Sequence, residues 1–285
     1  MSQPASPNPL LDSVPRRQVD FNLDSPELAE TYDRVGVRQF NHGKQLIADL
    51  DPQPGEHVLD IGSGTGLLGA YVAEKVSPNG RVFGIDPLPH RVDIAARKGQ
   101  PNFEVHVGRA EDLSQFSSAS FDVVYLNSVF HWVEDKPKAL AEIFRVLKPG
   151  GRLGFNSGDA ERPHQSSSLL REAADAAGIP ADKQPHGRQL GAISNAQAQA
   201  LVESAGFSDY RGGTRTIVDT VPHAQDLLEW SRSSSFGNSL GKFGASEEQR
   251  LRDALQTKLE AYRKAEGIQL ERYLIFVTAR KPLVS

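Results

Sequence analysis

A glycine-rich stretch near residue 60 limits the possible folds of this chain more than any other feature of its sequence. Residues 58–69 read VLDIGSGTGLLG, an apolar run typical of a strand, followed by glycines and then by a run typical of a helix. Glycines between a strand and a helix let the backbone approach a ligand closely, and the free N–H groups at the helix N-terminus attract anions. The stretch therefore predicts a strand, loop and helix that bind a cofactor.

Two overlapping glycine signatures in this stretch indicate different cofactors. From Gly64 to Gly69 the spacing is GxGxxG, which is typical of dinucleotide-binding loops, and Asp86 follows at about the 20-residue distance expected for an acid that binds a ribose hydroxyl. From Asp60 the stretch is an acid-x-Gly-x-Gly-x-Gly pattern, and Asp60 has no assigned place in the dinucleotide fingerprint. Because GxGxxG alone is weak evidence, the stretch by itself leaves both kinds of cofactor open.

Short apolar runs alternate with helical patterns along the middle of the chain. The predicted strands are 57–61, 81–85, 103–107, 122–127 and 152–156. The clearest helix is 137–147, where Leu140, Ile143, Phe144 and Leu147 have the spacing of one buried helical face. Alternating strands and helices imply right-handed crossovers and a parallel sheet, so we expect an α/β fold of Rossmann-like type.

The remaining segments suggest how the chain is divided. We expect a mobile tail over 1–20, an N-terminal helical cap over 21–50, a cofactor-binding core over 51–158, a polar substrate-side insertion over 159–192, and a C-terminal part over 193–285 that completes the sheet. Ser25 followed by Pro26 predicts the start of a cap helix. Ser246 with Gln249 predicts a capping box at the start of the last helix.

Composition excludes several classes of function. The net charge is −4 and no run of lysine and arginine stands out, so we expect no nucleic-acid partner. With zero cysteines, the chain has no disulfide, thiolate metal site or cysteine nucleophile, and its scattered histidines lack the paired spacing of a metal site.

No apolar run approaches the roughly 18 residues that cross a bilayer, and four prolines in the first fifteen residues argue against a secretory leader. We expect a cytoplasmic protein whose partner is a small molecule; the sequence predicts no oligomeric state.

A set of motifs in a fixed order decides between the two cofactors. The motifs are Asp60-Ile61-Gly62-Ser63-Gly64-Thr65-Gly66, the acid Asp86, Ala110-Glu111-Asp112, Phe121-Asp122-Val123-Val124 leading to Asn127-Ser128, and Leu147-Lys148-Pro149-Gly150-Gly151. Over about residues 58–158 the chain resembles the class I S-adenosylmethionine-dependent methyltransferases, particularly the small-molecule group that includes quinone-biosynthesis and trans-aconitate methyltransferases. The resemblance implies a mostly parallel seven-stranded sheet with helices on both faces, a helical cap and a substrate-side insertion.

The resemblance also implies which residues bind S-adenosylmethionine. Gly62, Ser63 and Gly64 would line the methionine part, Asp86 would accept hydrogen bonds from both ribose hydroxyls, and Glu111 with Ala110 would contact the adenine edge. The full set implied for the cofactor is Tyr32, Asp60, Gly62, Ser63, Gly64, Gly66, Asp86, Pro87, Ala110, Glu111 and Asn127. The chemistry agrees, because a carboxylate matches a diol and an adenine amino group needs a hydrogen-bond acceptor.

Catalytic residues are harder to predict, because the methyl group of a sulfonium is already activated and positioning supplies much of the rate. His131 follows the fourth predicted strand, and it is a candidate general base or anion-binding group; the alternative is that it packs with Trp132. Phe236 and Phe243 lie in a Ser- and Gly-rich segment, 231–246, that is either a lid or a plain surface loop.

Other polar residues are candidates for the acceptor pocket. These are Arg38, His42, Arg162, His164, His186, Arg188 and Arg232. Three of them, Arg162, Arg188 and Arg232, would suit a carboxylate acceptor, because a guanidinium group binds a carboxylate through two parallel hydrogen bonds.

We therefore predict an S-adenosylmethionine-dependent methyltransferase that moves a methyl group to an O, N or C atom of a small metabolite, of the kind made in secondary metabolism. Carboxyl methylation of a small acid is an alternative. An NAD-dependent oxidoreductase is disfavoured by Asp60 and by the motif at 110–112, and a noncatalytic S-adenosylmethionine-binding protein would carry the same motifs. The sequence does not identify the methyl acceptor, because specificity lies in the least recognisable segments.

Overall fold

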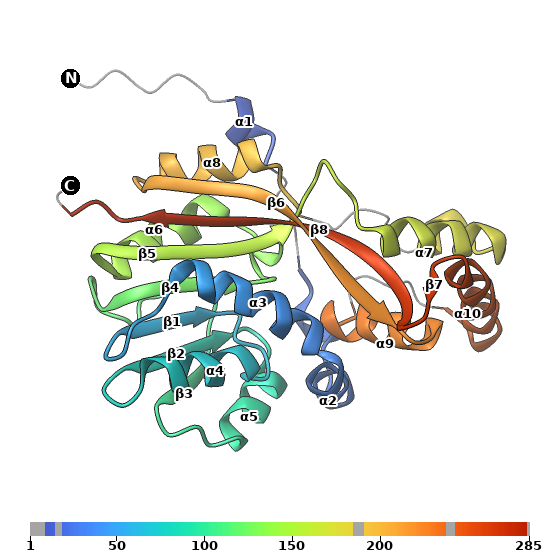
Figure 1. The fold of residues 1–285 in the computed structure, drawn as a ribbon, viewed down its shortest axis with the longest axis horizontal. Coiled ribbons are helices and arrows are strands. Elements are labelled where there is room, and N and C mark those ends of the chain that lie inside the picture. Colours follow the sequence, from blue (N-terminus) through green and yellow to red (C-terminus); the bar gives the residue numbers. More distant parts are fainter. Residues whose placement is uncertain (1–8, 15–18, 185–190, 238–242, 284–285) are drawn as a thin grey trace.

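A twisted eight-stranded sheet forms the centre of the computed structural model, which describes residues 9–14, 19–184, 191–237 and 243–283 (Figure 1). The strands are β1 (His57–Ile61), β2 (Arg81–Asp86), β3 (Phe103–Val107), β4 (Phe121–Asn127), β5 (Leu147–Gly158), β6 (Ser208–Val221), β7 (Arg263–Lys264) and β8 (Gly267–Arg280). Their order is β3-β2-β1-β4-β5-β8-β6; the first five are parallel, and β8 is antiparallel to both of its neighbours. The predicted seven-stranded Rossmann-like sheet is confirmed, and β7 is a two-residue addition that pairs with β8.

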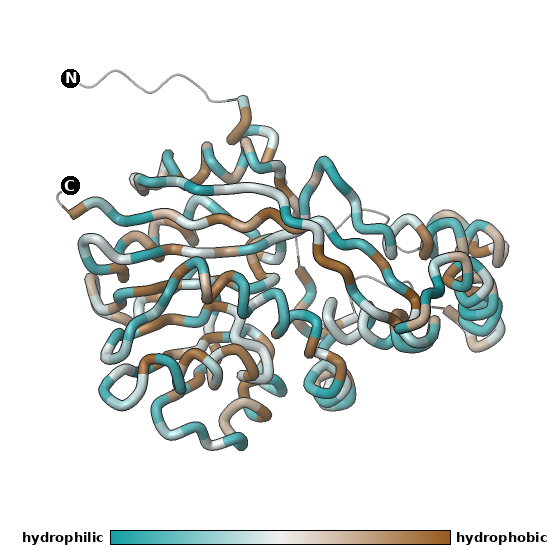
Figure 2. Tube along the Cα trace, viewed as in Figure 1, coloured by the Kyte–Doolittle hydropathy of each residue, from teal (hydrophilic) through white to brown (hydrophobic). Residues whose placement is uncertain are grey.

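Helices cover both faces of this sheet. They are α1 (Pro9–Asp12), α2 (Pro26–Val35), α3 (Val37–Leu50), α4 (Leu67–Val76), α5 (Pro89–Arg97), α6 (Lys136–Val146), α7 (Gln165–Ala176), α8 (Asn195–Ser204), α9 (Ala224–Ser234) and α10 (Ala245–Glu260), with short 3-10 turns η1 (Phe21–Leu23), η2 (Phe130–Trp132) and η3 (Ala181–Lys183). Successive strand side chains point to opposite faces, so Val58 packs in the layer with α3 and α4 while Leu59 packs in the layer with α6 and α8. Figure 2 shows the resulting apolar segments along the central strands.

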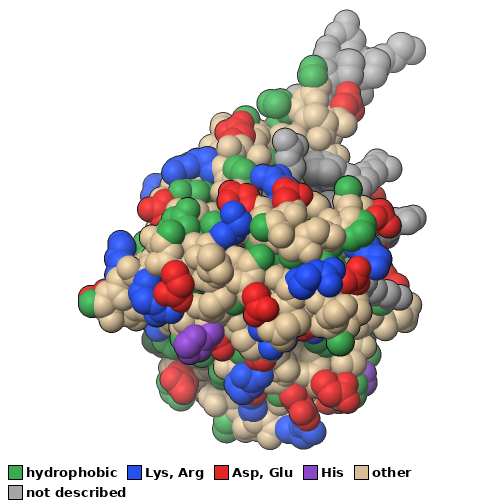
Figure 3. All heavy atoms as spheres, turned by 90° about the vertical axis from the view of Figure 1, so that its right-hand side faces the viewer, with side chains coloured by type: hydrophobic (Ala, Val, Ile, Leu, Met, Phe, Trp, Pro, Cys, Tyr) green, Lys and Arg blue, Asp and Glu red, His purple; other side chains and the backbone are tan. Residues whose placement is uncertain are grey.

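The long strands β6 and β8 extend beyond the rest of the sheet toward α7, α9 and α10 (Figure 1). Their far ends and these three helices form a separate apolar cluster, which contains Leu169, Leu227, Leu255 and Leu270. Within the described residues, the segment predicted as an insertion thus packs against the C-terminal part of the chain through α7 and α10. On this side of the molecule acidic and basic side chains are interspersed (Figure 3).

Of the two helix caps predicted from local residues, one is confirmed and the other is wrong. Ser25 caps α2 as predicted, since its hydroxyl accepts the Leu28 N–H at 3.2 Å. The predicted capping box of the last helix is wrong: α10 begins at Ala245, and the Gly244 N–H donates to Glu247 Oε2 at 2.9 Å. Because the helix starts earlier than expected, Glu247 rather than Gln249 occupies the third helical position.

At the N-terminus, residues 1–8 and 15–18 of the predicted tail lie outside the described part of the chain. Residues Pro9–Asp12 form α1, which packs against α8. In the described ranges, no helix has the length and apolar character needed to span a membrane.

Candidate functional site

The glycine loop lies between β1 and α4, at the edge where the carboxyl ends of the parallel strands meet. Gly62, Gly64 and Gly66 have φ angles of 75°, 55° and 83°, in the left-handed region that glycine tolerates best. The N–H groups of Gly62 and Ser63 both donate to the Ile85 carbonyl, at 2.7 and 3.0 Å. A Cβ atom at position 62 would lie 2.2 Å from Val129 Cγ2, so the loop passes too close to its neighbour for any side chain.

Asp86 ends β2 beside this loop and is 5% exposed. Its Oδ2 accepts the Gly64 N–H and its Oδ1 accepts the Leu88 N–H, both at 2.9 Å. Burial raises the pKa of Asp86, while the Arg91 guanidinium and the two backbone N–H groups oppose that rise. Each carboxylate oxygen has two lone pairs, so a carboxylate held in this way can still accept hydrogen bonds from a ligand.

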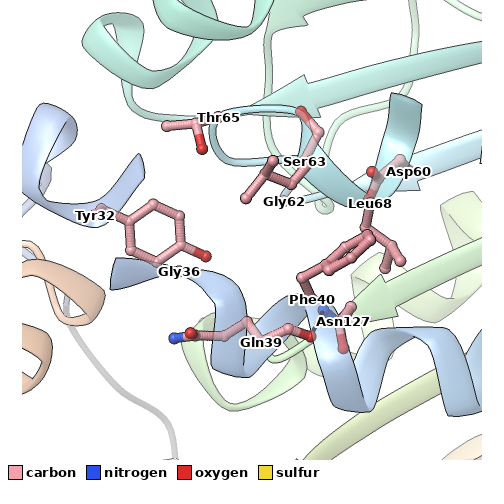
Figure 4. A pocket seen from close by; sticks show the side chains of 11 residues that line it. Tyr32, Gly36, Gln39, Phe40, Asp60, Gly62, Ser63, Thr65, Leu68 and Asn127 are labelled. Carbon is pink, nitrogen blue, oxygen red and sulfur yellow. Dashed lines mark hydrogen bonds between the residues drawn. The ribbon is translucent and has the colours of Figure 1, made fainter. Parts of the chain in front are cut away.

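Two adjoining cavities open at this edge, with about 380 and 490 Å³ of empty space that includes open solvent. Both are lined by Tyr32, Gln39, Gly62 and Asn127. In the first cavity, Tyr32 from α2 and Gln39 from α3 lie across from the side chains of the glycine loop (Figure 4). The second cavity adds Phe21, Asp86, Pro87, Arg91, Ser128, Trp132 and Phe236 to the lining.

The first cavity contains a buried carboxyl group that lacks a full set of partners. Asp60 is 2% exposed, and its Oδ2 has no hydrogen-bond partner among the described residues. Burial raises the pKa of Asp60 to about 7; the Tyr125 hydroxyl opposes this, and the Asp86 carboxylate adds to it. The buried Ser63 Oγ likewise has no partner in the part of the chain that the structure describes. A positively charged, hydrogen-bonding ligand group would therefore satisfy this cavity.

Aromatic side chains cover the second cavity. The Phe21 ring stacks on Phe236 with centroids 5.7 Å apart, and Phe236 lies 4.7 Å from Trp132. Beside them the Arg91 guanidinium lies 4.2 Å above the Tyr32 ring, and its Nη2 donates to a carbonyl at the end of α9 at 2.7 Å. The sequence did not predict Phe21 and Arg91, because no motif marks residues that meet only through packing; Phe236 was a candidate within a segment predicted to be either a lid or a plain surface loop.

Most of the predicted cofactor residues come together at these cavities. Those that line one or both are Tyr32, Asp60, Gly62, Ser63, Gly64, Asp86, Pro87 and Asn127. Gly66 is placed just behind them, as the residue that precedes α4. Asn127 is fixed in both directions, because its Nδ2 donates to the Gln39 carbonyl at 3.0 Å and its Oδ1 accepts from Asn156 Nδ2 at 2.8 Å.

Besides Gly66, three predicted residues are absent from the described lining of both cavities: Ala110, Glu111 and His131. Glu111 Oε1 accepts the Glu134 N–H at 2.8 Å, so this carboxylate organises the loop after η2. His131 is 3% exposed and its ring centroid lies 5.2 Å from that of Trp132, which is the member of the pair that lines the second cavity. The position of His131 thus favours the packing alternative.

The residues predicted for an acceptor pocket are spread over the structure. Arg162 is exposed and lies 4.0 Å above the Tyr273 ring, and Arg232 pairs with Glu248 at 3.3 Å. His164 is buried, and its Nδ1 accepts the Tyr273 N–H at 3.2 Å. Arg188 and His186 lie outside the described residues. The described ranges contain no cluster of His, Asp or Glu side chains suited to a metal ion.

Comparison with known proteins agrees with this geometry. A family model described as a methyltransferase domain matches residues 59–155. Nocamycin O-methyltransferase of Saccharothrix syringae is 34% identical over 224 residues, which cover 73% of this chain and 79% of that protein. The chain belongs to the class I S-adenosylmethionine-dependent methyltransferases.

Two further proteins similar to this methyltransferase extend the match toward its full length. Trans-aconitate 2-methyltransferase of Deinococcus radiodurans is 26% identical over 244 residues, or 84% of this chain and 92% of that protein. A solved structure of Haemonchus contortus phosphoethanolamine N-methyltransferase 2 in complex with S-adenosyl-L-methionine has a TM-score of 0.56 at 20% identity, and the match covers 98% of this chain and 61% of that one. The predicted family is confirmed, and the dinucleotide interpretation of GxGxxG is dropped.

S-adenosylmethionine is therefore the cofactor, and the residues of the methyltransferase fit it. The cofactor carries a sulfonium and an ammonium group, whose positive charge the buried Asp60 carboxyl would complement when it is ionised. The glycine loop leaves room where any Cβ atom at position 62 would collide. When bound, the cofactor supplies a methyl group that its positively charged sulfur has already activated for transfer. The protein then has to hold the cofactor, orient the acceptor toward its methyl group, and exclude water.

Proposed function

We propose that this methyltransferase binds S-adenosylmethionine across the two adjoining cavities and methylates a small, partly apolar metabolite at the carboxyl ends of β4 and β5. Asp86 would bind the ribose hydroxyls, the loop from Gly62 to Gly64 would line the methionine part, and Pro87 would lie beside the adenine. The observation that carries the proposal is the placement of Asp86. It is buried at a strand end, and both carboxylate oxygens are already oriented by backbone N–H groups.

The remaining assignments follow from the same contacts. Tyr32 and Asn127 would close the first cavity, because each lines it from a different element. Glu111 would contact the adenine edge through its second oxygen, since Oε1 already accepts two backbone N–H groups, those of Glu134 and Asp135. The Ala110 side chain is buried next to it. For His131 we propose a packing role beneath Trp132.

The acceptor class and the setting belong to the same proposal. Two relatives are named for nocamycin and aklanonic acid, which supports a small organic acceptor of secondary metabolism. We propose a cytoplasmic location, which the dependence on an intracellular cofactor supports. The division into a cap at 21–50, a core at 51–158, an insertion at 159–192 and a C-terminal part at 193–285 also remains a proposal.

Calorimetric titration with S-adenosylmethionine, S-adenosylhomocysteine and NADH tests the cofactor assignment. We expect micromolar binding of the first two and a loss of at least about tenfold in Asp86→Asn, because hydrogen bonds to a charged group are lost. Asp122→Asn is the matched control. Asp122 also accepts a backbone N–H, from His57 at 2.9 Å, but it lies at the amino end of β4, away from the carboxyl ends of the strands. Its affinity should stay within about twofold of the wild-type value. Binding of NADH alone, or equal losses in both variants, would overturn the proposal.

A further inference from the structure

Four buried or half-buried side chains form a continuous chain from β6 to the second cavity. Asp219 pairs with Arg272, with 2.5 Å between Nε and Oδ2. Arg272 Nη2 lies 3.1 Å from His42 Nδ1, and His42 Nε2 lies 2.8 Å from Ser128 Oγ. The first three side chains are at most 9% exposed, while Ser128 lines the cavity. These contacts connect α3, β6 and β8 to the residue that follows β4.

The direction of each hydrogen bond follows from the donors available. A guanidinium group only donates, so Arg272 must donate to Nδ1 of His42. Burial first, and then the positive charge of Arg272 and the nearby His164 and His131 rings, hold the pKa of His42 well below its usual range, although the Arg38 backbone carbonyl opposes this lowering. The ring is therefore neutral with its proton on Nε2, and that N–H donates to Ser128 Oγ.

Ser128 itself is held in an unusual backbone conformation. Its φ of 60° lies in the left-handed region, where a non-glycine residue is strained. Its N–H donates to Asn156 Oδ1 at 2.7 Å, so the backbone and the hydroxyl are fixed by separate partners. Since Oγ already accepts the His42 N–H, the hydroxyl's own proton is left to donate. Within the described residues no acceptor for that proton is found, and Ser128 lines the second cavity at the end of β4, where the methyl acceptor is proposed to bind.

We propose that Ser128, positioned by His42 and Arg272, donates a hydrogen bond to the methyl acceptor, and that the acceptor presents an anionic oxygen to it, either a carboxylate or a phenolate. This inference rests on the proposed function and deepens it. His42 cannot serve as a base through Ser128, because its one free lone pair is occupied by Arg272. The site therefore suits an acceptor that arrives without a proton to lose.

The transfer balances without a base. An anionic oxygen donates its electron pair to the new O–C bond, while the breaking C–S bond leaves its pair on sulfur. The negative oxygen and the positive sulfonium both become neutral, and no proton leaves. Ser128 would orient the oxygen through one lone pair and leave another for the bond that forms.

The test uses protein saturated with S-adenosylhomocysteine, titrated with trans-aconitate as the carboxylate probe and with 4-nitrophenolate at pH 8 as the phenolate probe. We expect one probe to bind, and the arm that binds identifies the source of the anionic oxygen. Ser128→Gly should weaken that binding at least about tenfold, the loss expected for a hydrogen bond to a charged group. Glycine adopts the φ of this position without strain, so the variant should fold, and its loss of S-adenosylhomocysteine affinity should be clearly smaller than its loss of probe affinity.

A second pair of variants separates positioning from mere structure. His42→Gln retains an amide N–H that can donate to Ser128, and its binding of the probe should stay near the wild-type value. His42→Leu lacks that donor and should match Ser128→Gly. In parallel, nitrogen NMR of the wild-type protein should show His42 neutral and protonated at Nε2 between pH 6 and 8.

Several results would overturn the inference. The first is that the wild-type protein binds S-adenosylhomocysteine but neither probe. The second is that Ser128→Gly binds the probe as the wild type does, or loses as much affinity for S-adenosylhomocysteine as for the probe. The third is a His42 ring that is charged or protonated at Nδ1. Failure of the wild-type protein to bind S-adenosylhomocysteine would instead refute the proposed function.

Discussion

Replacing Gly62 with alanine tests whether the glycine loop is shaped by backbone conformation, by close packing, or by both. The left-handed φ of 75° alone should cost about 1–2 kcal/mol for an alanine. The added Cβ would also lie 2.2 and 2.8 Å from the two γ carbons of Val129, an overpacking that costs about 1–3 kcal/mol. We therefore expect Gly62→Ala to lower the free energy of unfolding by about 2–5 kcal/mol, a large share of a typical total of about 5–15 kcal/mol.

Urea denaturation of the purified variant measures this loss, and two further variants separate its causes. Gly99 has a similar φ of 65°, but a Cβ atom there would have no atom within 4 Å, so Gly99→Ala should lose only the backbone part, about 1–2 kcal/mol. Adding Val129→Ala to Gly62→Ala removes both colliding carbons and should recover the packing part as a favourable interaction energy in a double-mutant cycle. The reasoning is refuted if Gly62→Ala is no more destabilising than Gly99→Ala, or if Val129→Ala recovers nothing.

Two other predictions concern buried charges. The pKa of Asp60 is about 7 in the folded protein, against an ordinary value of 3.8. Between these values the folded state holds a proton that the unfolded state has lost. The free energy of unfolding of the wild-type protein should therefore fall as the pH rises from about 4 to about 7, by up to about 4 kcal/mol. Asp60→Asn lacks this loss, so its unfolding free energy relative to wild type should be higher at pH 8 than at pH 5 in urea melts; equal differences at both pH values would contradict the assignment. Asp219→Ala leaves the Arg272 guanidinium buried without its partner and should cost about 3–5 kcal/mol, whereas the double variant Asp219→Leu with Arg272→Met should cost clearly less. Additive losses in the same denaturation assay would count against a coupled pair.

The contacts around the two cavities explain why the same core can serve different acceptors. The groups proposed to hold the cofactor lie on β1, β2 and the glycine loop, which are parts of the rigid sheet edge. The cover is built from η1, α2 and the end of α9, which meet through the Phe21, Tyr32 and Phe236 rings. Specificity can therefore change through the cover and the C-terminal strands while the cofactor-binding edge stays intact.

The parts of this protein that the sequence alone determined are those governed by neighbouring residues. Strand periodicity predicted the parallel core, and the Ser25 cap was predicted from adjacent residues. The acids at the ends of the first two strands predicted the position of the cofactor loop, because parallel strands bring their carboxyl ends to one edge. The predicted start of α10 was wrong because two overlapping windows offer an acceptable cap, and the helix begins at the earlier one.

Only the tertiary structure decided which distant residues meet. His42 and Ser128 are 86 positions apart, and Arg272 lies 230 positions beyond His42, yet the three side chains form one hydrogen-bonded chain. The Glu111 carboxylate accepts a backbone N–H 23 positions away, a partner that no motif predicts. No local propensity records such pairs, because they form only when α3, β4 and β8 are packed against one another. The sequence therefore determined the cofactor and the sheet that carries it, and the packing of its elements determined the hydroxyl that we propose faces the methyl acceptor.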